Sequence, residues 1–214
     1  MTSTPGLRER LAALFGRRRR SPERWVVVDT ETSGLDPARD ALLAIGAVAV
    51  DDEGIRLADS FEVVLRHDGP VDAGSVLVHG LGHAAQRGGA PVAAALADFA
   101  DFVAGAPCVG FHVAFDRAVL SRAFAAAGAS GAPAEWLDVA DLAATLDPDA
   151  HKRGARSLDD CLARYGIETL SRHTAAGDAL ATAELLLRLR ARAAADGHRG
   201  FSALAGVSRQ HRWL

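Results

Sequence analysis

The sequence predicts an α/β protein built on a mixed β-sheet, an antiparallel three-strand meander followed by parallel strands, with helices flanking the sheet. The Val-rich strand predicted at residues 25–29 is continuously apolar up to Asp29, which is typical of a central strand buried on both faces. Two more strand patterns follow, at about 42–50 and 55–66, with the turn Asp51-Asp52-Glu53-Gly54 between them. Later short strands alternate with helical patterns, which favours a sheet covered by helices.

The middle of the chain alternates between helical and strand patterns. Residues 92–103 carry apolar side chains at helical spacing, with Pro91 near the start, where proline is tolerated. Residues 107–111 read as a short strand. Residues 113–127 then form a helix that Gly128 closes.

The last third of the chain is predicted to be mainly helical. Residues 157–165 form a helix with Ser157 as its N-cap and Asp160 near a capping-box position, and Gly166 ends it. The other elements expected here are a short strand at 136–139 that runs into a helix to about 146, and the longest helix at 175–195.

The length of 214 residues suggests one folded domain with appendages. We divide the chain into an N-terminal arm at 1–23, a domain at 24–195 and a weakly patterned tail at 196–214. The arm contains the basic run 17–20. We favour a solvated arm over the alternative, a segment that contacts phosphates or a partner.

Composition narrows the possible functions. The net charge of −3 provides no general attraction to nucleic acid, so such a substrate would need local positive groups or bound metal cations. Cys108 and Cys161 lack the spacing of a zinc site, and nothing suggests a disulfide framework, which favours a cytoplasmic location. No apolar run approaches the length of a membrane span, and we see no signal peptide.

One pair of acids stands at the end of the buried strand. Asp29 and Glu31 are two residues apart, so both carboxylates point to the same face. Their repulsion would be relieved by a divalent cation, and oxygen ligands suit Mg²⁺ or Mn²⁺. The similar acid clusters at 51–53 and 147–149 lie in turn-like segments, where we expect them simply to be solvated.

Three further residues gain meaning only in combination. Asp116 falls in the first turn of a helix, where any acid is favoured by the helix dipole. His173 and Asp178 are five residues apart, about 500° on an ideal helix, so their side chains would diverge. They can share a site only if His173 lies in the loop before the helix, which the sequence permits.

Taken in order, these segments resemble the DEDDh exonuclease family, of the proofreading-subunit type of bacterial DNA polymerase III, on a ribonuclease H-like fold. The resemblance covers about residues 24–190. The first motif has Ser33 where threonine is common, and the second has Phe111-His112 where the family often carries His-Asn. The matching segments are 29–36 (DTETSGLD), 112–116 (HVAFD) and 173–179 (HTAAGDA), with supporting stretches at 45–48, 78–80, 157–159 and 165–167.

The resemblance implies a metal-dependent 3′→5′ exonuclease that hydrolyses nucleotides from the 3′ end of DNA and releases nucleoside 5′-monophosphates. Two divalent cations, Mg²⁺ or Mn²⁺, would be held by the four acids, and His173 would take a proton from the attacking water. Thr32 and Leu35 would meet the terminal nucleotide, although Leu35 could equally pack on its own domain. The implied metal ligands are Asp29, Glu31, Asp116 and Asp178.

Other functions stay open at this stage. The expected partner is a single-stranded DNA 3′ end, with RNA trimming as the nearest alternative. A catalytically silent nucleic-acid-binding module would show loss of the motif residues, but the four acids and His173 are all present. For His79 and His112 we expect structural or exposed roles. The long C-terminal extension that joins some family members to a polymerase is not evident, so a polymerase partner is left open.

Overall fold

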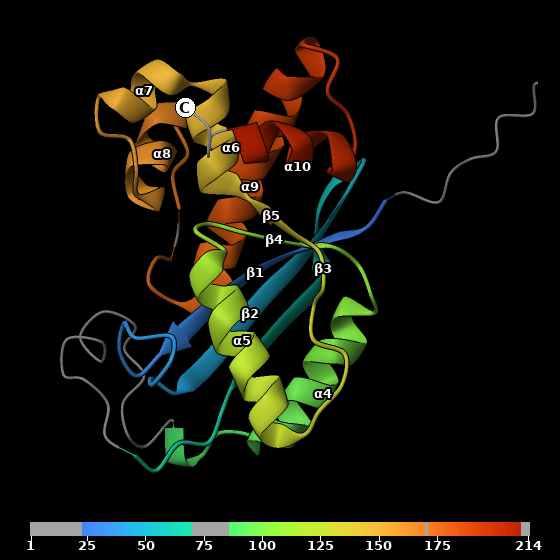
Figure 1. Cartoon of the computed structure of the whole chain (residues 1–214), viewed down its shortest axis with the longest axis vertical. Coiled ribbons are helices and arrows are strands. Elements are labelled where there is room, and N and C mark those ends of the chain that lie inside the picture. The colour runs from blue at the N-terminus through green and yellow to red at the C-terminus, as the bar shows by residue number, and fades with distance from the viewer. Residues whose placement is uncertain (1–22, 70–85, 170, 211–214) are drawn as a thin grey trace, which may run out of the picture.

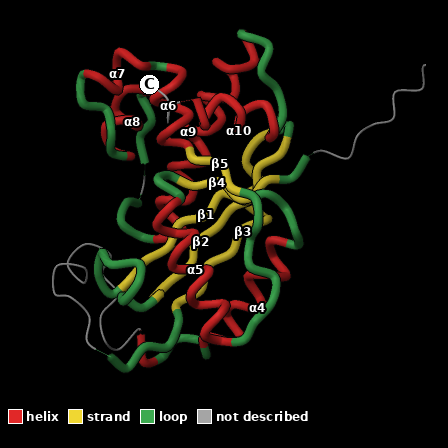
Figure 2. Tube along the Cα trace, viewed as in Figure 1, coloured by secondary structure: helices red, strands yellow, loops and turns green. Residues whose placement is uncertain are grey.

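The chain folds around a five-stranded mixed sheet in this computed structural model, which describes residues 23–69, 86–169 and 171–210 (Figures 1 and 2). The strand order is β3-β2-β1-β4-β5. The first three strands are antiparallel neighbours, and β4 and β5 continue the sheet in parallel with β1. The predicted meander followed by parallel strands is confirmed. The strands are β1 (Trp25–Thr32), β2 (Leu42–Asp51), β3 (Gly54–Val64), β4 (Cys108–Gly110) and β5 (Trp136–Asp138).

Helices cover both faces of the sheet (Figure 1). α4 and α5 pack on one face, and α6, α8, α9 and α10 pack on the other. α9 spans the residues that its apolar pattern predicted. The helices are α4 (Val92–Val103), α5 (Ala114–Ala127), α6 (Val139–Leu146), α7 (Pro148–Lys152), α8 (Leu158–Tyr165), α9 (Ala175–Ala195) and α10 (Phe201–Gln210).

Strand β1 divides its side chains between the two cores. Trp25 and Val27 are buried against the α9 layer, whereas Val26 and Val28 are buried against α4 and α5. Successive strand residues point to opposite faces, so a fully apolar run is required where both faces are covered. This alternation decides which way the polar end of the strand points.

The segment after residue 195, which the sequence analysis described as a weakly patterned tail, contains a helix. α10 lies there, and its Phe201 and Leu204 are buried in the core that α9 shares. Phe201 also meets Trp25 edge to face, with ring centroids 5.6 Å apart. The apolar spacing of this segment is helical but short, and its burial depends on a partner at the other end of the chain. We therefore propose that the folded domain extends from 24 to 210.

Two acids that we expected to be simply solvated are buried. Asp51 accepts hydrogen bonds from the backbone N–H groups of Glu53 and Gly54, at 2.8 and 3.2 Å, and so organises the turn between β2 and β3. Asp147 caps α7 and pairs with Arg164 at 2.8 Å. Both clusters are accounted for by local structure, which leaves the acids of β1 as the functional candidates.

The helix ends largely follow their predicted signals. The capping box of Ser157 and Asp160 is present at the start of α8, and Gly166 ends that helix in the left-handed conformation, with φ of 62°. Among the described residues, no helix combines the length and the apolar character needed to cross a membrane.

Candidate active site

Two acids of the site belong to β1. Asp29 and Glu31 continue the face of the strand that carries Trp25 and Val27, so both point toward the α9 layer. In the sheet Asp29 is paired with Gly46 of the neighbouring strand β2. Both side chains are partly buried, and they share one face of the strand, as their spacing predicted.

A glycine lets α9 reach this strand. A Cβ atom on Gly46 would lie 2.1 Å from the carbonyl carbon of Ala175, at the first residue of α9, so only glycine fits there. Thr174 caps the helix by accepting the N–H of Gly177 at 3.2 Å. The close approach carries Asp178, in the first turn of α9, over the acids of β1.

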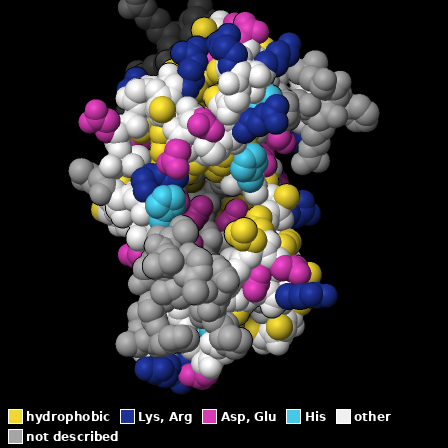
Figure 3. Space-filling view, turned by 90° about the vertical axis from the view of Figure 1, so that its left-hand side faces the viewer, with side chains coloured by type: hydrophobic (Ala, Val, Ile, Leu, Met, Phe, Trp, Pro, Cys, Tyr) yellow, Lys and Arg dark blue, Asp and Glu magenta, His cyan; other side chains and the backbone are white. Residues whose placement is uncertain are grey.

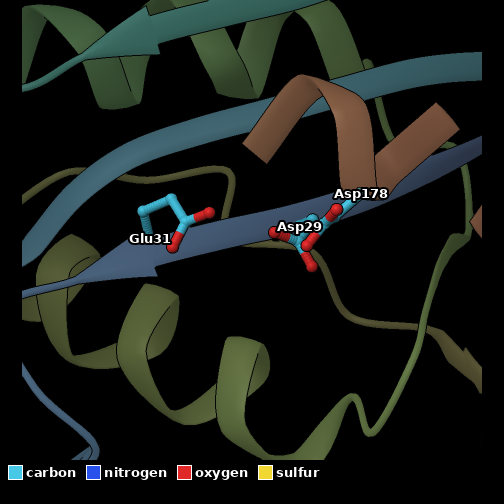
Figure 4. Close-up of side chains that lie close together, drawn as sticks. All are labelled: Asp29, Glu31 and Asp178. Carbon is cyan, nitrogen blue, oxygen red and sulfur yellow. The ribbon is translucent and has the colours of Figure 1, made fainter. Parts of the chain in front are cut away.

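Three carboxylates therefore converge from two elements. Asp29, Glu31 and Asp178 each offer an oxygen within 4.8 Å of the others (Figure 4). The face of the molecule shown in Figure 3 is hollowed, and acidic side chains lie inside the hollow with histidine side chains at its edges. Three hard oxygen donors at this separation suit Mg²⁺ or Mn²⁺.

The carboxylates of this site repel one another. The pKa of Asp29 is raised well above its usual value, first by burial and then by the charges of Asp116 and Glu31. Burial and the charge of Asp116 raise the pKa of Glu31 to about 7. A bound cation would relieve this repulsion, so the residues present fit a metal.

Asp116 adjoins this group, and its charge raises the pKa of both Asp29 and Glu31. The residue lies in the first turn of α5, as predicted, and it is buried. Thr30, which points to the α5 side of β1, donates its hydroxyl to Asp116 Oδ1 at 2.7 Å. Burial raises the pKa of Asp116 to about 6, and the bond from Thr30 opposes that rise. The structure thus brings three of the four predicted acids together, with the fourth beside them.

The turn before α5 is held by a residue that the sequence analysis missed. Asp138, at the end of β5, accepts the backbone N–H groups of His112 and Val113, each at 3.1 Å. His112 has a φ of 58°, a left-handed conformation that asparagine and histidine tolerate better than most residues. The sequence signal for Asp138 was its place between a short strand and a helix, which is typical of an N-cap.

His112 itself has a structural role. Its Nε2 lies 3.1 Å from the carbonyl oxygen of Arg156, and its ring packs edge to face on Phe111 with centroids 4.7 Å apart. These contacts agree with the structural role that we expected for it. His79 lies outside the described residues.

His173 lies in the loop before α9, as the spacing required. It has a φ of 59°, its side chain is exposed, and its backbone N–H donates to Asp178 Oδ1 at 3.1 Å. The loop position lets His173 and Asp178 share one site despite their separation on an ideal helix. The histidine and the acid are also linked directly, since the loop N–H orients the carboxylate.

The residue before this histidine was also missed from the sequence. Arg172 pairs with Asp178 through Nη1 and with Asp159 through Nε, the latter at 2.8 Å. Its charge lowers the pKa of both Asp29 and Glu31. A basic residue immediately before His173 was the only signal, because Asp159 approaches through tertiary folding.

The two predicted nucleotide contacts differ in their surroundings. Thr32 is buried and donates its hydroxyl to the carbonyl oxygen of Gly34 at 2.6 Å. Leu35 is 91% exposed, so the alternative that it packs on its own domain was wrong. Arg122 of α5 holds the loop beneath it by donating Nε to the carbonyl oxygen of Pro37 at 3.0 Å. The loop presents an apolar side chain to solvent on an anchored backbone.

Comparisons with known proteins show which family and which relatives this chain is similar to. The family model RNase_T, described as an exonuclease, matches residues 26–186. A DNA polymerase III subunit epsilon-like protein of Rhodobacter capsulatus is 34% identical over 191 residues, which are 87% of this chain and 26% of that protein. A PolC-type DNA polymerase III of Latilactobacillus sakei is 26% identical over 79% of this chain and 11% of its own length. The chain thus spans about a quarter or less of these curated relatives.

Solved structures share the fold. E. coli exonuclease I in complex with a dT13 oligonucleotide superposes with a TM-score of 0.68 at 20% identity, over 86% of this chain and 46% of that one. Exonuclease X in complex with 5′ overhanging duplex DNA superposes with a TM-score of 0.67 at 20% identity, over 86% of this chain and 99% of that one.

Proposed function

The chain belongs to the RNase_T exonuclease family and has the ribonuclease H-like fold that its motifs predicted, and on that premise we propose that it is a metal-dependent 3′→5′ exonuclease acting on DNA. It would release nucleoside 5′-monophosphates. The observation that supports this best is the convergence of Asp29, Glu31 and Asp178, with oxygens within 4.8 Å of one another. DNA is favoured because a relative is named as DNA polymerase III epsilon-like and two structural neighbours were solved with DNA.

We infer that two divalent cations, Mg²⁺ or Mn²⁺, bind at this site. Asp29, Glu31 and Asp178 offer the converging oxygens, and Asp116 would complete the set from the α5 side. When bound, two such cations stabilise the charge on the attacking and leaving oxygens of a phosphodiester. The hydroxyl of Thr30 would fix the orientation of Asp116, and the backbone N–H of His173 would fix that of Asp178.

The proton and the substrate would be handled by the two loops beside the acids. We propose that His173 takes the proton from the attacking water, because its side chain is exposed and its backbone N–H is bound to Asp178 of the carboxylate group. Leu35 would contact the terminal nucleotide through its exposed side chain. Thr32 would contribute through its backbone, since its hydroxyl is bound to Gly34.

Digestion of 5′-end-labelled single-stranded DNA tests this function. In Mg²⁺ or Mn²⁺ we expect a ladder shortened from the 3′ end, mononucleotide products, and no cleavage in EDTA. The substitutions Asp29→Ala and Asp178→Ala should each abolish the activity. Asp98→Ala, an exposed acid of α4 away from the site, is the matched control and should leave it unchanged.

Three outcomes would contradict the proposal. Undiminished turnover in Asp29→Ala or Asp178→Ala would remove these acids from the reaction. Degradation from the 5′ end would reverse the direction. A matched RNA strand that is digested faster than the DNA would reassign the substrate and favour RNA trimming.

A further inference from the structure

Arg172 has no role in the proposed mechanism, and it lies between two helices. Its side chain bridges Asp178 in the first turn of α9 and Asp159 in the first turn of α8. The arginine side chain is 19% exposed and that of Asp178 is 14% exposed, whereas that of Asp159 is 63% exposed. The guanidinium is therefore anchored at the border between the carboxylate group and the surface.

The contact with Asp178 uses an oxygen of the carboxylate group itself. Nη1 of Arg172 binds Oδ1 of Asp178, the same atom that accepts the N–H of His173. A cation that used this oxygen would meet the positive charge of the guanidinium at close range. An arginine stays charged at any pH at which the protein is folded, so proton loss cannot remove this conflict.

The second partner gives the guanidinium another place to bind. Asp159 lies outside the converging carboxylates and already accepts Nε of Arg172 at 2.8 Å. If the contact with Asp178 were broken, the arginine would keep a charged partner at the rim of the site. The arrangement thus allows a movement of one side chain without leaving a buried charge unpaired.

We propose that Arg172 is an internal counter-cation that balances the carboxylates in the metal-free protein and gives up its contact with Asp178 when a divalent cation binds, thereby weakening metal affinity. This inference rests on the proposed function, because it assumes that the carboxylates bind a metal. Arg172 is a positioning residue in this view: it acts through Asp178 and is not assigned any contact with the substrate.

Metal affinity of the full chain tests the proposal. Mn²⁺ binding is measured by the loss of the free-ion EPR signal for the wild type, Arg172→Gln and Arg56→Gln. Arg56→Gln removes an equal charge beside Asp51, far from the site, and should leave the dissociation constant unchanged. Arg172→Gln should bind Mn²⁺ roughly ten-fold more tightly, by analogy with the shift of about one pKa unit or more that a close charge produces in a carboxyl group. Equal or weaker binding by Arg172→Gln would overturn the proposal.

A second measurement follows Arg172 in the wild-type protein, where its charge is retained. In uniformly ¹⁵N-labelled wild type, the Nε–H resonance of Arg172 is assigned by its absence in Arg172→Lys and followed during titration with Mg²⁺. We expect it to shift with the same midpoint as metal binding, whereas a resonance that does not move would overturn the proposal. A wild type that binds no Mn²⁺ would instead refute the proposed function, so the two failures are distinguishable.

Discussion

Replacing Gly46 with alanine should move Asp178 of α9 away from the two acids of β1, Asp29 and Glu31. Gly46 lies in β2 directly opposite Asp29, and β2 is hydrogen-bonded on both sides, to β1 and β3. An added Cβ would lie 2.1 Å from the carbonyl carbon of Ala175. Because the strand is held in the sheet, α9 has to move, and Asp178 moves with it.

The size of the effect follows from this contact. Ordinary contact begins at 3.4 Å, so the start of α9 must retreat by about 1.3 Å. Overpacking of this kind costs roughly 1–3 kcal/mol of stability. That corresponds to about 2–4 °C in melting temperature for each kcal/mol in a domain of this size. A misplacement of about 1 Å in a catalytic group can lower the rate roughly 10²-fold.

The assay compares the folding and the activity of two glycine variants. Gly206→Ala is the matched control, because a Cβ at this position in α10 meets nothing within 4 Å. That substitution should stabilise the helix by about 0.5–1 kcal/mol and leave activity unchanged. Gly46→Ala should melt lower and lose metal-dependent turnover at a temperature where it is still folded, as judged by circular dichroism.

Wild-type turnover in Gly46→Ala would refute this reasoning. It would mean either that α9 does not need to approach β2 so closely, or that Asp178 does not act with Asp29. A variant that melts lower but cuts DNA at the normal rate would separate these possibilities, since it would confirm the packing and reject the shared site.

The remaining predictions concern charge, the proposed base and the turn before α5. Glu31 has a pKa of about 7 in the folded chain against an ordinary 4.5, so between these values the folded state holds a proton that the unfolded state has lost. In EDTA, the free energy of unfolding measured in urea should therefore fall as pH rises through that window. Mn²⁺ should reduce this pH dependence. A free energy of unfolding that does not change with pH in EDTA would argue against the raised pKa of Glu31. His173→Ala should lower turnover roughly 10²–10⁴-fold while Mn²⁺ affinity stays near the wild-type value, and a lost affinity would make His173 a ligand. Asp138→Ala removes the acceptor of the His112 N–H and should cost about 1–3 kcal/mol in urea unfolding together with activity, so unchanged stability would contradict the proposed clamp.

The local periodicity of the chain was enough to predict the elements that carry the site. The unbroken apolar run before Asp29 identified a strand covered on both faces, and the spacing of Asp29 and Glu31 placed both acids on one of them. The bounds of α9 and the loop position of His173 also followed from sequence, because helical spacing and capping signals act over a few residues.

The relations between those elements needed the tertiary structure. Three contacts join segments that no periodicity connects. They are the close approach of Gly46 to the start of α9, the hydrogen bond from Thr30 to Asp116, and the ion pair of Arg172 with Asp159. For the same reason α10 was missed, since its apolar residues acquire a core only where α9 and Trp25 meet them. The sequence by itself determined which face of each element is polar, because side-chain direction repeats along the backbone. Only packing decided which polar faces meet, because that depends on shape and close approach between distant parts of the chain.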